Sequence, residues 1–532
     1  MWQTNVGFRG RFPPVPQHKV FNLIVTAIAS GLSRLSGLVT VVVAGWFLSE
    51  AEFGVYAIAT GVTTFTLLLR GGGSGLLLQT MTPKEFADIG GSLARVALTF
   101  ALVGLCLTAL SVRPANAYYQ HDDLGSTLMW LAASMFIFQL GTFPRGKVAS
   151  ALRFEKLAFI DIAAAAAKLG VAYWCASRGW GAATLAVALA ASTSVQTAGA
   201  LIWADLSPSD FRVAPGWVGR MVTLLKSPLL ISILITIAAQ IDTFVASFFV
   251  PVATLGIYFF AANIATAPVQ LVVGAIKSVL APYAARARGS AKQERAAMEA
   301  TFASGTLFAP LALMLLATIY PSLSRLLWDS KWEASVWPVM LGCALLIYPT
   351  IQGLLEGPVM GLRDWREYFS ILSWRAGSRL LGAIAAVVAV WQLALPAQGT
   401  AIALTVGVGG FASIVAFFQI RSLLRRYGVD QEMVAFEIHS PTIYAVVALV
   451  ATHGVVASIL DSATALSLSG RGGAAIECAL CFTIFSLIAL ALLRFAYLGK
   501  LGLILAAVPN PLRAAILRML RIQESTINPL ED

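Results

Sequence analysis

Apolar runs of about 20 or more residues recur along the whole chain, and each is long enough to cross a bilayer as an α-helix. The first run begins at Val20. It is too long for the core of a signal peptide, and no small-residue cleavage site follows it, so we interpret it as a retained span. Only 12% of the 532 residues are charged, whereas about 25% is usual in soluble domains. The sequence therefore predicts an all-α polytopic membrane protein.

A polar linker and a basic amphipathic segment divide the predicted spans, about fourteen in number, into sets of six, six and two. We interpret the first two sets as six-helix lobes and the last two helices as an addition to them. From the amino terminus the predicted organisation is a cytoplasmic segment (1–19), the first lobe (20–203), a cytoplasmic linker (204–220), the second lobe (221–420), a cytoplasmic amphipathic segment (421–440), two further helices (441–499) and a cytoplasmic tail (500–532).

Lysine and arginine are distributed unevenly between the two faces of the predicted membrane. With the amino terminus placed in the cytoplasm, 23 of them fall in cytoplasmic segments and 5 in external segments. Positively charged loops of membrane proteins tend to lie on the cytoplasmic side, and the excess alternates correctly across the spans. Both termini are therefore predicted to be cytoplasmic. The net charge of +11 is attributed to this orientation and not to nucleic-acid binding.

One short sequence occurs twice: GVYAIATGVTTF begins at Gly54, and GIYFFAANIATA begins at Gly256. Aligned without a gap, residues 40–65 and 242–267 share 8 identities in 26 positions, at an offset of 202. A second pair, ALRFEKLAF after span 4 and GLRDWREYF after span 10, recurs at an offset of 210. Six predicted crossings separate the copies, so both enter the membrane in the same sense. This indicates a parallel repeat about an axis along the membrane normal, with two lobes that face each other across a cleft.

Nine basic residues lie within predicted spans, where a charge at the bilayer centre costs at least about 2.5 kcal/mol and usually faces an interior or a water-filled cavity. Arg34 and Arg70 lie about 21 and 24 Å from the external ends of their spans, at a helical rise of about 1.5 Å per residue. Lys226 and Lys277 lie near the cytoplasmic ends of theirs. We interpret all four as candidate binding residues for a phosphate-bearing anion. The alternative for Lys226 and Lys277 is that they only snorkel to the inner interface.

Few acidic residues enter or border the spans. Asp161 and Lys168 stand seven residues apart on one face of a predicted helix, so a pair between them, direct or through water, is expected. Asp242 lies about 12 Å below the external end of its span. It either carries a coupling proton or sodium ion, or it neutralises Arg375 or Arg379, because a buried arginine needs a counter-charge.

Motifs for enzymatic or cofactor chemistry are absent from the sequence. There is no GxxxxGK[ST] motif for ATP hydrolysis, the four histidines form no metal cluster, and the five cysteines all fall within apolar runs. No nucleophile, base and orienting group can be assembled from their spacing. We therefore expect no enzyme activity, no cofactor and no metal, and we consider a proton or sodium gradient as the energy source.

Three stretches carry a family resemblance: SRLSGLVTVVVAGWFLSEAEFGVYAIATGVTTF, PRGKVASALRFEKLAFID, and PLLISILITIAAQIDTFVASFFVPVATLGIYFFAANIATAPVQLVVGAIKSVLAPYAARAR. They resemble the polysaccharide transporter (Wzx-type flippase) branch of the multidrug/oligosaccharidyl-lipid/polysaccharide exporter superfamily, over residues 20–425. The resemblance implies two lobes that rock around a central cavity. It also implies movement of a polyprenyl-diphosphate-linked oligosaccharide across the bacterial inner membrane, for exopolysaccharide, capsule or O-antigen synthesis.

The same resemblance sets expectations about substrate and partners. Lipid II flippases of this superfamily usually carry a further basic residue where this chain has Leu38, Val39 and Thr40, so the resemblance argues against a peptidoglycan precursor. The implied partners are the lipid-linked glycan, membrane lipids, and polysaccharide polymerase and assembly proteins. The amphipathic segment and the tail either lie on the cytoplasmic membrane surface or dock such proteins.

Three alternatives to a flippase stay open at this point. A cation-coupled antiporter for small molecules or drugs belongs to the same superfamily, but the inward basic residues favour an anionic ligand. A membrane glycosyltransferase that uses a lipid-linked donor would need a large external loop with catalytic acids or histidines, and the longest external stretch, at 321–334, is short. A scaffold without transport is disfavoured by the repeat.

Overall fold

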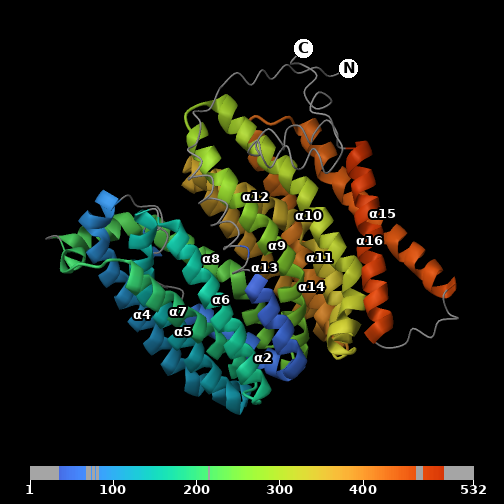
Figure 1. Cartoon of the computed structure of the whole chain (residues 1–532), viewed down its shortest axis with the longest axis horizontal. Coiled ribbons are helices and arrows are strands. Elements are labelled where there is room, and N and C mark those ends of the chain that lie inside the picture. The colour runs from blue at the N-terminus through green and yellow to red at the C-terminus, as the bar shows by residue number, and fades with distance from the viewer. Residues whose placement is uncertain are drawn as a thin grey trace.

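The structure is a computed structural model, and it describes residues 31, 35–66, 73–74, 78, 83–151, 153–213, 216–462 and 471–496. Across these residues the secondary structure is helical, with short connections and no strand (Figure 1). The predicted all-α class is confirmed. Helices are the outcome that physical chemistry favours here, because the backbone groups of a segment within a bilayer must be hydrogen-bonded inside the segment itself.

The helices follow the predicted order of spans. The described chain begins with an apolar helix over Leu35–Phe47. It continues with α2 (Glu50–Thr66), α4 (Pro83–Tyr119), α5 (Asp122–Ser150), α6 (Phe154–Ser177), α7 (Ala183–Trp203) and the 3-10 turn η2 (Pro208–Phe211). The next set is α8 (Trp217–Ser247), α9 (Val252–Ala287), α10 (Ala291–Trp328), η3 (Glu333–Ser335), α11 (Val336–Leu345), α12 (Ile347–Leu362), α13 (Trp365–Leu393) and α14 (Ala397–Arg426). The last two helices are α15 (Gln431–Ser462) and α16 (Arg471–Ala496).

Eleven of the described helices are long and apolar enough to cross a membrane, and the pair formed by α11 and α12, which is bent by 48°, would make a twelfth span. Helices Leu35–Phe47 and α2 are shorter. They correspond to the first two predicted spans, parts of which lie outside the described residues. Together these helices agree with the predicted series of about fourteen spans.

One predicted element differs from the structure. Helix α14 extends to Arg426, and α15 begins at Gln431 and runs without a break into the predicted thirteenth span. The segment 421–440 is therefore mostly helical and continuous with its neighbours, instead of a separate surface element. The predicted cytoplasmic segment 1–19 and tail 500–532 lie outside the described residues, and the lobe boundaries stay predictions.

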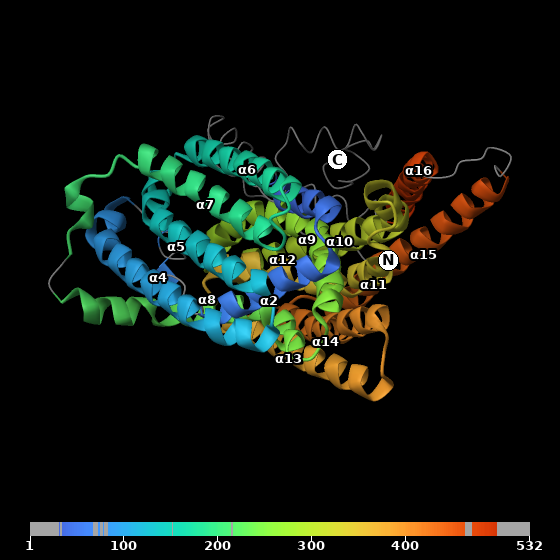
Figure 2. The same ribbon diagram turned by 90° about the horizontal axis from the view of Figure 1, so that it is seen from below.

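The long helices form two bundles that meet along a seam (Figures 1 and 2). In the first bundle α5 packs against α4 and α7, and α7 packs against α6. In the second bundle α8 packs against α13, α13 against α14, and α9 against α10 and α12. Helix α2 lies on the seam, where it contacts α8 and α9 on one side and α5 on the other. Helices α15 and α16 pack on α10, at the far edge of the second bundle.

The two copies of the repeated sequence meet on this seam. A β-carbon on Gly54 would lie 1.9 Å from the carbonyl oxygen of Val252, and one on Gly256 would lie 1.8 Å from that of Glu50. Glu50 and Val252 are themselves equivalent at the offset of 202, so the contact is reciprocal, as a two-fold relation requires. Only glycine permits two backbones to approach so closely. The repeat is therefore a packing surface between the bundles, in which each copy of the sequence packs against the other.

Candidate functional site

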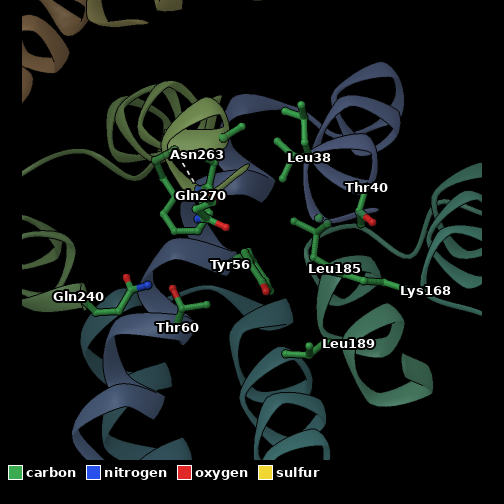
Figure 3. Close-up of a pocket in the computed structure, with 14 residues that line it drawn as sticks. Leu38, Thr40, Tyr56, Thr60, Lys168, Leu185, Leu189, Gln240, Asn263 and Gln270 are labelled. Atoms are coloured by element: carbon green, nitrogen blue, oxygen red, sulfur yellow. Dashed lines mark hydrogen bonds between the residues drawn. The ribbon is translucent and has the colours of Figure 1, made fainter. Parts of the chain in front are cut away.

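A cavity of about 280 Å³ lies on the seam (Figure 3). Its walls come from helix Leu35–Phe47, from α2, from α6 and α7 of the first bundle, and from α8 and α9 of the second. A second cavity of about 300 Å³ shares Tyr56, Thr60, Leu189 and Gln240 with the first and extends toward α5. The two cavities share part of their walls, and together we call them the central space between the bundles. This is the position expected for a transported ligand.

The described lining of this space carries one charged side chain, Lys168. No aspartate or glutamate is among the described residues that line either cavity. The rest of the polar lining is neutral and carries hydroxyl or amide groups. In Figure 3, Tyr56 lies near the centre, with Lys168 on the α6 side and Gln240 on the opposite side. The cavity is therefore cationic at one side and hydrogen-bonding but uncharged at the other.

Lys168 occupies a central position in its helix. It lies 14 residues after Phe154 and 9 residues before Ser177, the ends of α6, which corresponds to about 21 and 14 Å. A β-carbon on Gly37 would lie 4.0 Å from Lys168 Nζ, so the ammonium reaches across to helix Leu35–Phe47. The side chain is partly buried, and it forms no ion pair with any described residue. At this depth snorkelling to an interface is unfavourable, so the ammonium is available to a ligand in the cavity.

Asp161 and Lys168 form no direct ion pair. Arg145 Nη1 and Nη2 instead donate to the two carboxylate oxygens of Asp161, each at 2.8 Å. Helix α5 extends to Ser150 and carries Arg145 up to α6. A planar guanidinium matches a carboxylate in two parallel hydrogen bonds, which an ammonium cannot do. Lys168 is left without the acid that spacing assigned to it.

Asp242 belongs to a buried cluster in the second bundle. Its carboxylate pairs with Arg379 at 3.0 Å and accepts a hydrogen bond from Tyr258 Oη at 2.5 Å. Arg379 also donates to the carbonyl oxygen of Ala238 at 2.8 Å. Asp242 is 1% exposed. Its charge is thus balanced inside the protein, and Asp242 is not among the described residues that line either cavity.

Arg375, the other arginine considered for Asp242, has a different partner. It forms an ion pair with Glu356 and donates to Gln352 Oε1 at 3.4 Å. Both Glu356 and Gln352 are on α12 and are buried. The two in-span arginines of α13 are therefore neutralised by acids of two different helices.

The four cations predicted to bind substrate are placed as follows. Arg34 and Arg70 lie outside the described residues, and so does the side chain of Lys277, although its helix α9 is described. Lys226 is exposed on α8 and lines neither cavity. The roles of Arg34, Arg70 and Lys277 stay predictions. The described cavity acquires its charge from Lys168, which sequence reasoning assigned to an internal pair.

One end of the seam is closed by aromatic packing. Trp332 stacks on Phe260 with ring centroids 3.9 Å apart, and Phe53 meets both rings edge-on. All three side chains are fully buried. Trp332 Nε1 also donates to the carbonyl oxygen of Gly45 at 3.0 Å, and Trp328 Nε1 donates to that of Val42 at 3.1 Å. This cluster, with the glycine contact beside it, seals the central space from the end of the molecule that predicted topology places outside.

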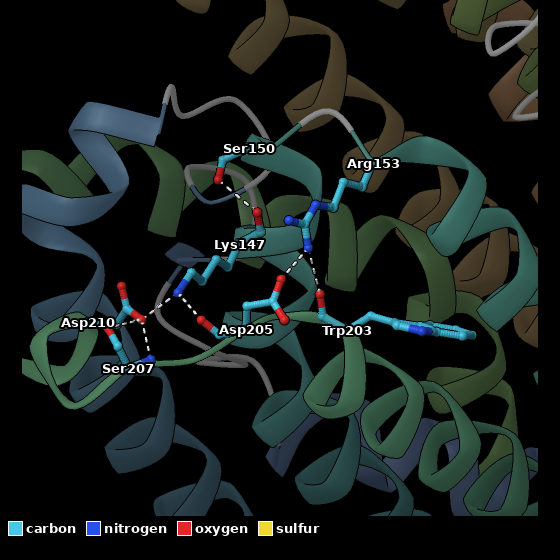
Figure 4. Close-up of polar contacts among 7 residues, drawn as sticks. All are labelled: Lys147, Ser150, Arg153, Trp203, Asp205, Ser207 and Asp210. Atoms are coloured by element: carbon cyan, nitrogen blue, oxygen red, sulfur yellow. Dashed lines mark hydrogen bonds and ion pairs between the residues drawn. The ribbon is translucent and has the colours of Figure 1, made fainter.

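The linker between the bundles is held on the first bundle by ionic contacts (Figure 4). Lys147 Nζ donates to Asp210 Oδ2 at 2.5 Å and to the carbonyl oxygen of Asp205 at 2.6 Å. Arg153 forms an ion pair with Asp205. The hydrogen bond and charge of Arg153 hold the pKa of Asp205 below its usual range. Desolvation acts to raise the pKa of Asp210, but hydrogen bonds from Lys147 and Ser207 outweigh it, and that pKa is also lowered.

Two bundles related by a repeat, with a cavity on their seam, define a class of polytopic membrane fold. The chain shares its fold with the lipid II flippase MurJ in an inward closed conformation, at a TM-score of 0.64 and 11% identity over 88% of this chain and 99% of that one. It also matches the MATE transporter VcmN of Vibrio cholerae, at a TM-score of 0.51 and 14% identity over 77% and 98%. At sequence identities this low, the structural similarity establishes the fold alone.

The family is identified by sequence. The family model described as polysaccharide biosynthesis protein matches residues 43–337, more than half of the chain, and the chain belongs to that family. The matched region includes both copies of the glycine repeat and the wall of the cavity that carries Lys168. No curated protein matches the sequence.

Proposed function

We propose that this protein is a flippase that moves a polyprenyl-diphosphate-linked oligosaccharide across the bacterial inner membrane by alternating access, and that it is not an enzyme. The observation that supports this most is Lys168, a mid-helix cation without an ionic partner among the described residues, in a seam cavity with no described acidic lining residue. A desolvated ammonium gains most from an anion that offers several oxygen acceptors. A diphosphate is such an anion.

The neutral part of the lining suits the glycan. Gln240, Asn263 and Gln270 contribute side-chain amides, and Thr60 and Thr236 contribute hydroxyls, to the walls of the two cavities. Amide and hydroxyl groups both donate and accept, so they can satisfy sugar hydroxyls that leave water. An uncharged sugar unit beside a diphosphate thus fits the division of the cavity into a cationic side and a neutral side.

Family and fold support the same assignment at a coarser level. The chain belongs to a polysaccharide biosynthesis family, and its fold is that of flippases and transporters. In this proposal the diphosphate lipid enters from the cytoplasmic face, the sealed end opens by separation of α2 and α9, and the glycan is delivered to the opposite face for exopolysaccharide, capsule or O-antigen assembly. A proton or sodium gradient is the proposed energy source, and polymerase and assembly proteins are the proposed partners.

Reconstitution into sealed vesicles tests the proposal. Lipid-linked oligosaccharide isolated from the source cells would be incorporated with the protein, and exposure of its glycan to a membrane-impermeant glycosidase would be followed over time. We expect protein-dependent movement of the glycan between leaflets, absent from vesicles without protein. Modification of the glycan without movement would instead indicate a glycosyltransferase. Gradient-driven movement of lipophilic cations without movement of the glycan lipid would indicate an antiporter.

A further inference from the structure

The cavity cation has a counterpart in the second bundle. Lys168 lies 14 residues after the first residue of α6, and Arg379 lies 14 residues after the first residue of α13. These helices are the fifth of each predicted lobe, and the related sequences ALRFEKLAF and GLRDWREYF lead into them. At the offset of 210 between these sequences Lys168 aligns with Ser378, so the two cations lie one position out of register at similar depths on equivalent helices.

The partners of Arg379 have counterparts as well. At the offset of 202, Asp242 corresponds to Thr40, and Tyr258 corresponds to Tyr56. The set Asp242, Tyr258 and Arg379 in the second bundle thus resembles the set Thr40, Tyr56 and Lys168 beside the first, with two positions equivalent and the cations one residue apart in register. All three members of the latter set line the seam cavity.

The two sets differ in one chemical respect, the acid. In the second bundle one carboxylate oxygen, Asp242 Oδ2, binds both the arginine and the tyrosine, so the arginine has an internal counter-charge. Beside the first bundle threonine replaces that carboxylate. Its hydroxyl donates to the carbonyl oxygen of Ser36, within its own helix, at 2.6 Å. No internal anion therefore occupies the position from which Asp242 neutralises Arg379.

We propose that Thr40 is a specificity-determining residue, whose neutral side chain keeps Lys168 available for the anionic group of the cargo. This inference rests on the proposed function and states how the proposed binding site selects a negatively charged cargo. An aspartate at position 40 would pair with Lys168 as Asp242 pairs with Arg379. A tethered carboxylate is present at a high effective concentration, so it competes with any diphosphate from solution or membrane. The cavity would then lose its preference for anions.

The test measures binding of a fluorescent polyprenyl diphosphate to the purified full-length protein in detergent. Thr40→Asp is compared with Thr40→Asn, which has nearly the same shape and no charge. We expect the affinity of Thr40→Asp to fall at least about tenfold, because a buried charge pair is commonly worth that much or more in binding. Thr40→Asn should stay within about threefold of the unmodified protein.

Position 37 provides a second route, because Thr40 is almost fully buried and its substitution could disturb folding. Gly37 is partly exposed, and its missing side chain points toward Lys168 Nζ at 4.0 Å. Gly37→Asp should therefore weaken binding of the same probe, and Gly37→Asn should not. Equal losses in the aspartate and asparagine variants, or no loss in either aspartate variant, would overturn the inference. Failure of the unmodified protein to bind the diphosphate would instead overturn the proposed function itself.

Discussion

At the scale of single residues, Asp242 and Arg379 show how this fold accommodates charge within the membrane. The arginine is held by one carboxylate and one backbone carbonyl, and the carboxylate is fixed by a tyrosine. Such an arrangement offsets desolvation only while both partners remain. We expect Asp242 to be required for stability, because its removal leaves a buried guanidinium uncompensated.

Asp242→Asn should lower the free energy of unfolding by about 3 to 5 kcal/mol, and thermal unfolding of the purified protein would measure it. The double variant Asp242→Asn/Arg379→Gln should recover part of the loss, because neither charge is then left alone. A fully stable Asp242→Asn variant whose transport no longer depends on an ion gradient would contradict this structural role and assign the carboxylate to ion coupling.

The sequence predicted an acidic partner for Arg375 or Arg379, and Asp242 pairs with Arg379, but the direct pair expected between Asp161 and Lys168 is absent. Spacing along one helix placed Asp161 and Lys168 on the same face, and that inference is sound for an isolated helix. The competitor, Arg145, comes from the preceding helix, and only tertiary structure brings it to Asp161. The repeat contained a usable signal, since Thr40 stands where the other copy has Asp242. This difference between the two copies can be interpreted only when α6 and α13 are known to be equivalent helices.

At the scale of helices, the crossing of α2 and α9 is the element on which closure depends. Gly54 and Gly256 allow each backbone to contact a carbonyl oxygen of the other copy. The aromatic cluster of Phe53, Phe260 and Trp332 then seals the seam beside this contact. Closing and opening of this end therefore involve the same pair of helices.

Gly54→Ala should prevent full closure, because its β-carbon would overlap the carbonyl oxygen of Val252 at 1.9 Å. We expect a cysteine at Thr60, in a background without native cysteines, to react faster with an impermeant thiol reagent added from the external side. Gly170→Ala is the matched control, since nothing lies within 4 Å of its added β-carbon. Unchanged labelling in Gly54→Ala would show that this contact does not control access.

The linker is a second element with a defined role, because its ion pairs attach it to the first bundle. The lowered pKa values of Asp205 and Asp210 mean that these carboxylates stabilise the attachment above the ordinary aspartate pKa of about 3.9. The stabilisation is lost as the pH falls through the lowered pKa values that these two aspartates have in the folded protein. The attachment should therefore persist at neutral and mildly acidic pH.

A spin label on Pro208→Cys would report this attachment. Its mobility should stay low between about pH 7 and pH 5 and rise below about pH 4. Adding Lys147→Met should raise the mobility of the label already at neutral pH, because the lysine donates hydrogen bonds to both Asp205 and Asp210 in the linker. Arg220→Met, which removes an exposed cation on the neighbouring helix α8, serves as the control. High mobility of the label at pH 7 without further substitution would contradict the attachment.

At the scale of the whole molecule, the sequence predicted the class and the order of helices well, because both depend on local hydrophobicity and on the repeat. The span series, the two halves and the family resemblance all agree with the structure and with the family match over residues 43–337. The cavity lining could not be predicted in the same way. It combines side chains from six helices that are far apart in the chain, and their depth and direction are set by packing between bundles.

In the proposed mechanism one cation on the seam, Lys168, holds the anionic group of a lipid-linked glycan during its passage. Translocation in sealed vesicles tests this most directly when the unmodified protein, Lys168→Arg and Lys168→Gln are compared at equal reconstitution. We predict that the arginine variant retains most of the rate and that the glutamine variant loses at least about 90% of it, since loss of a desolvated charge contact costs a factor of ten or more. Equal rates for Lys168→Gln and the unmodified protein would contradict the central claim.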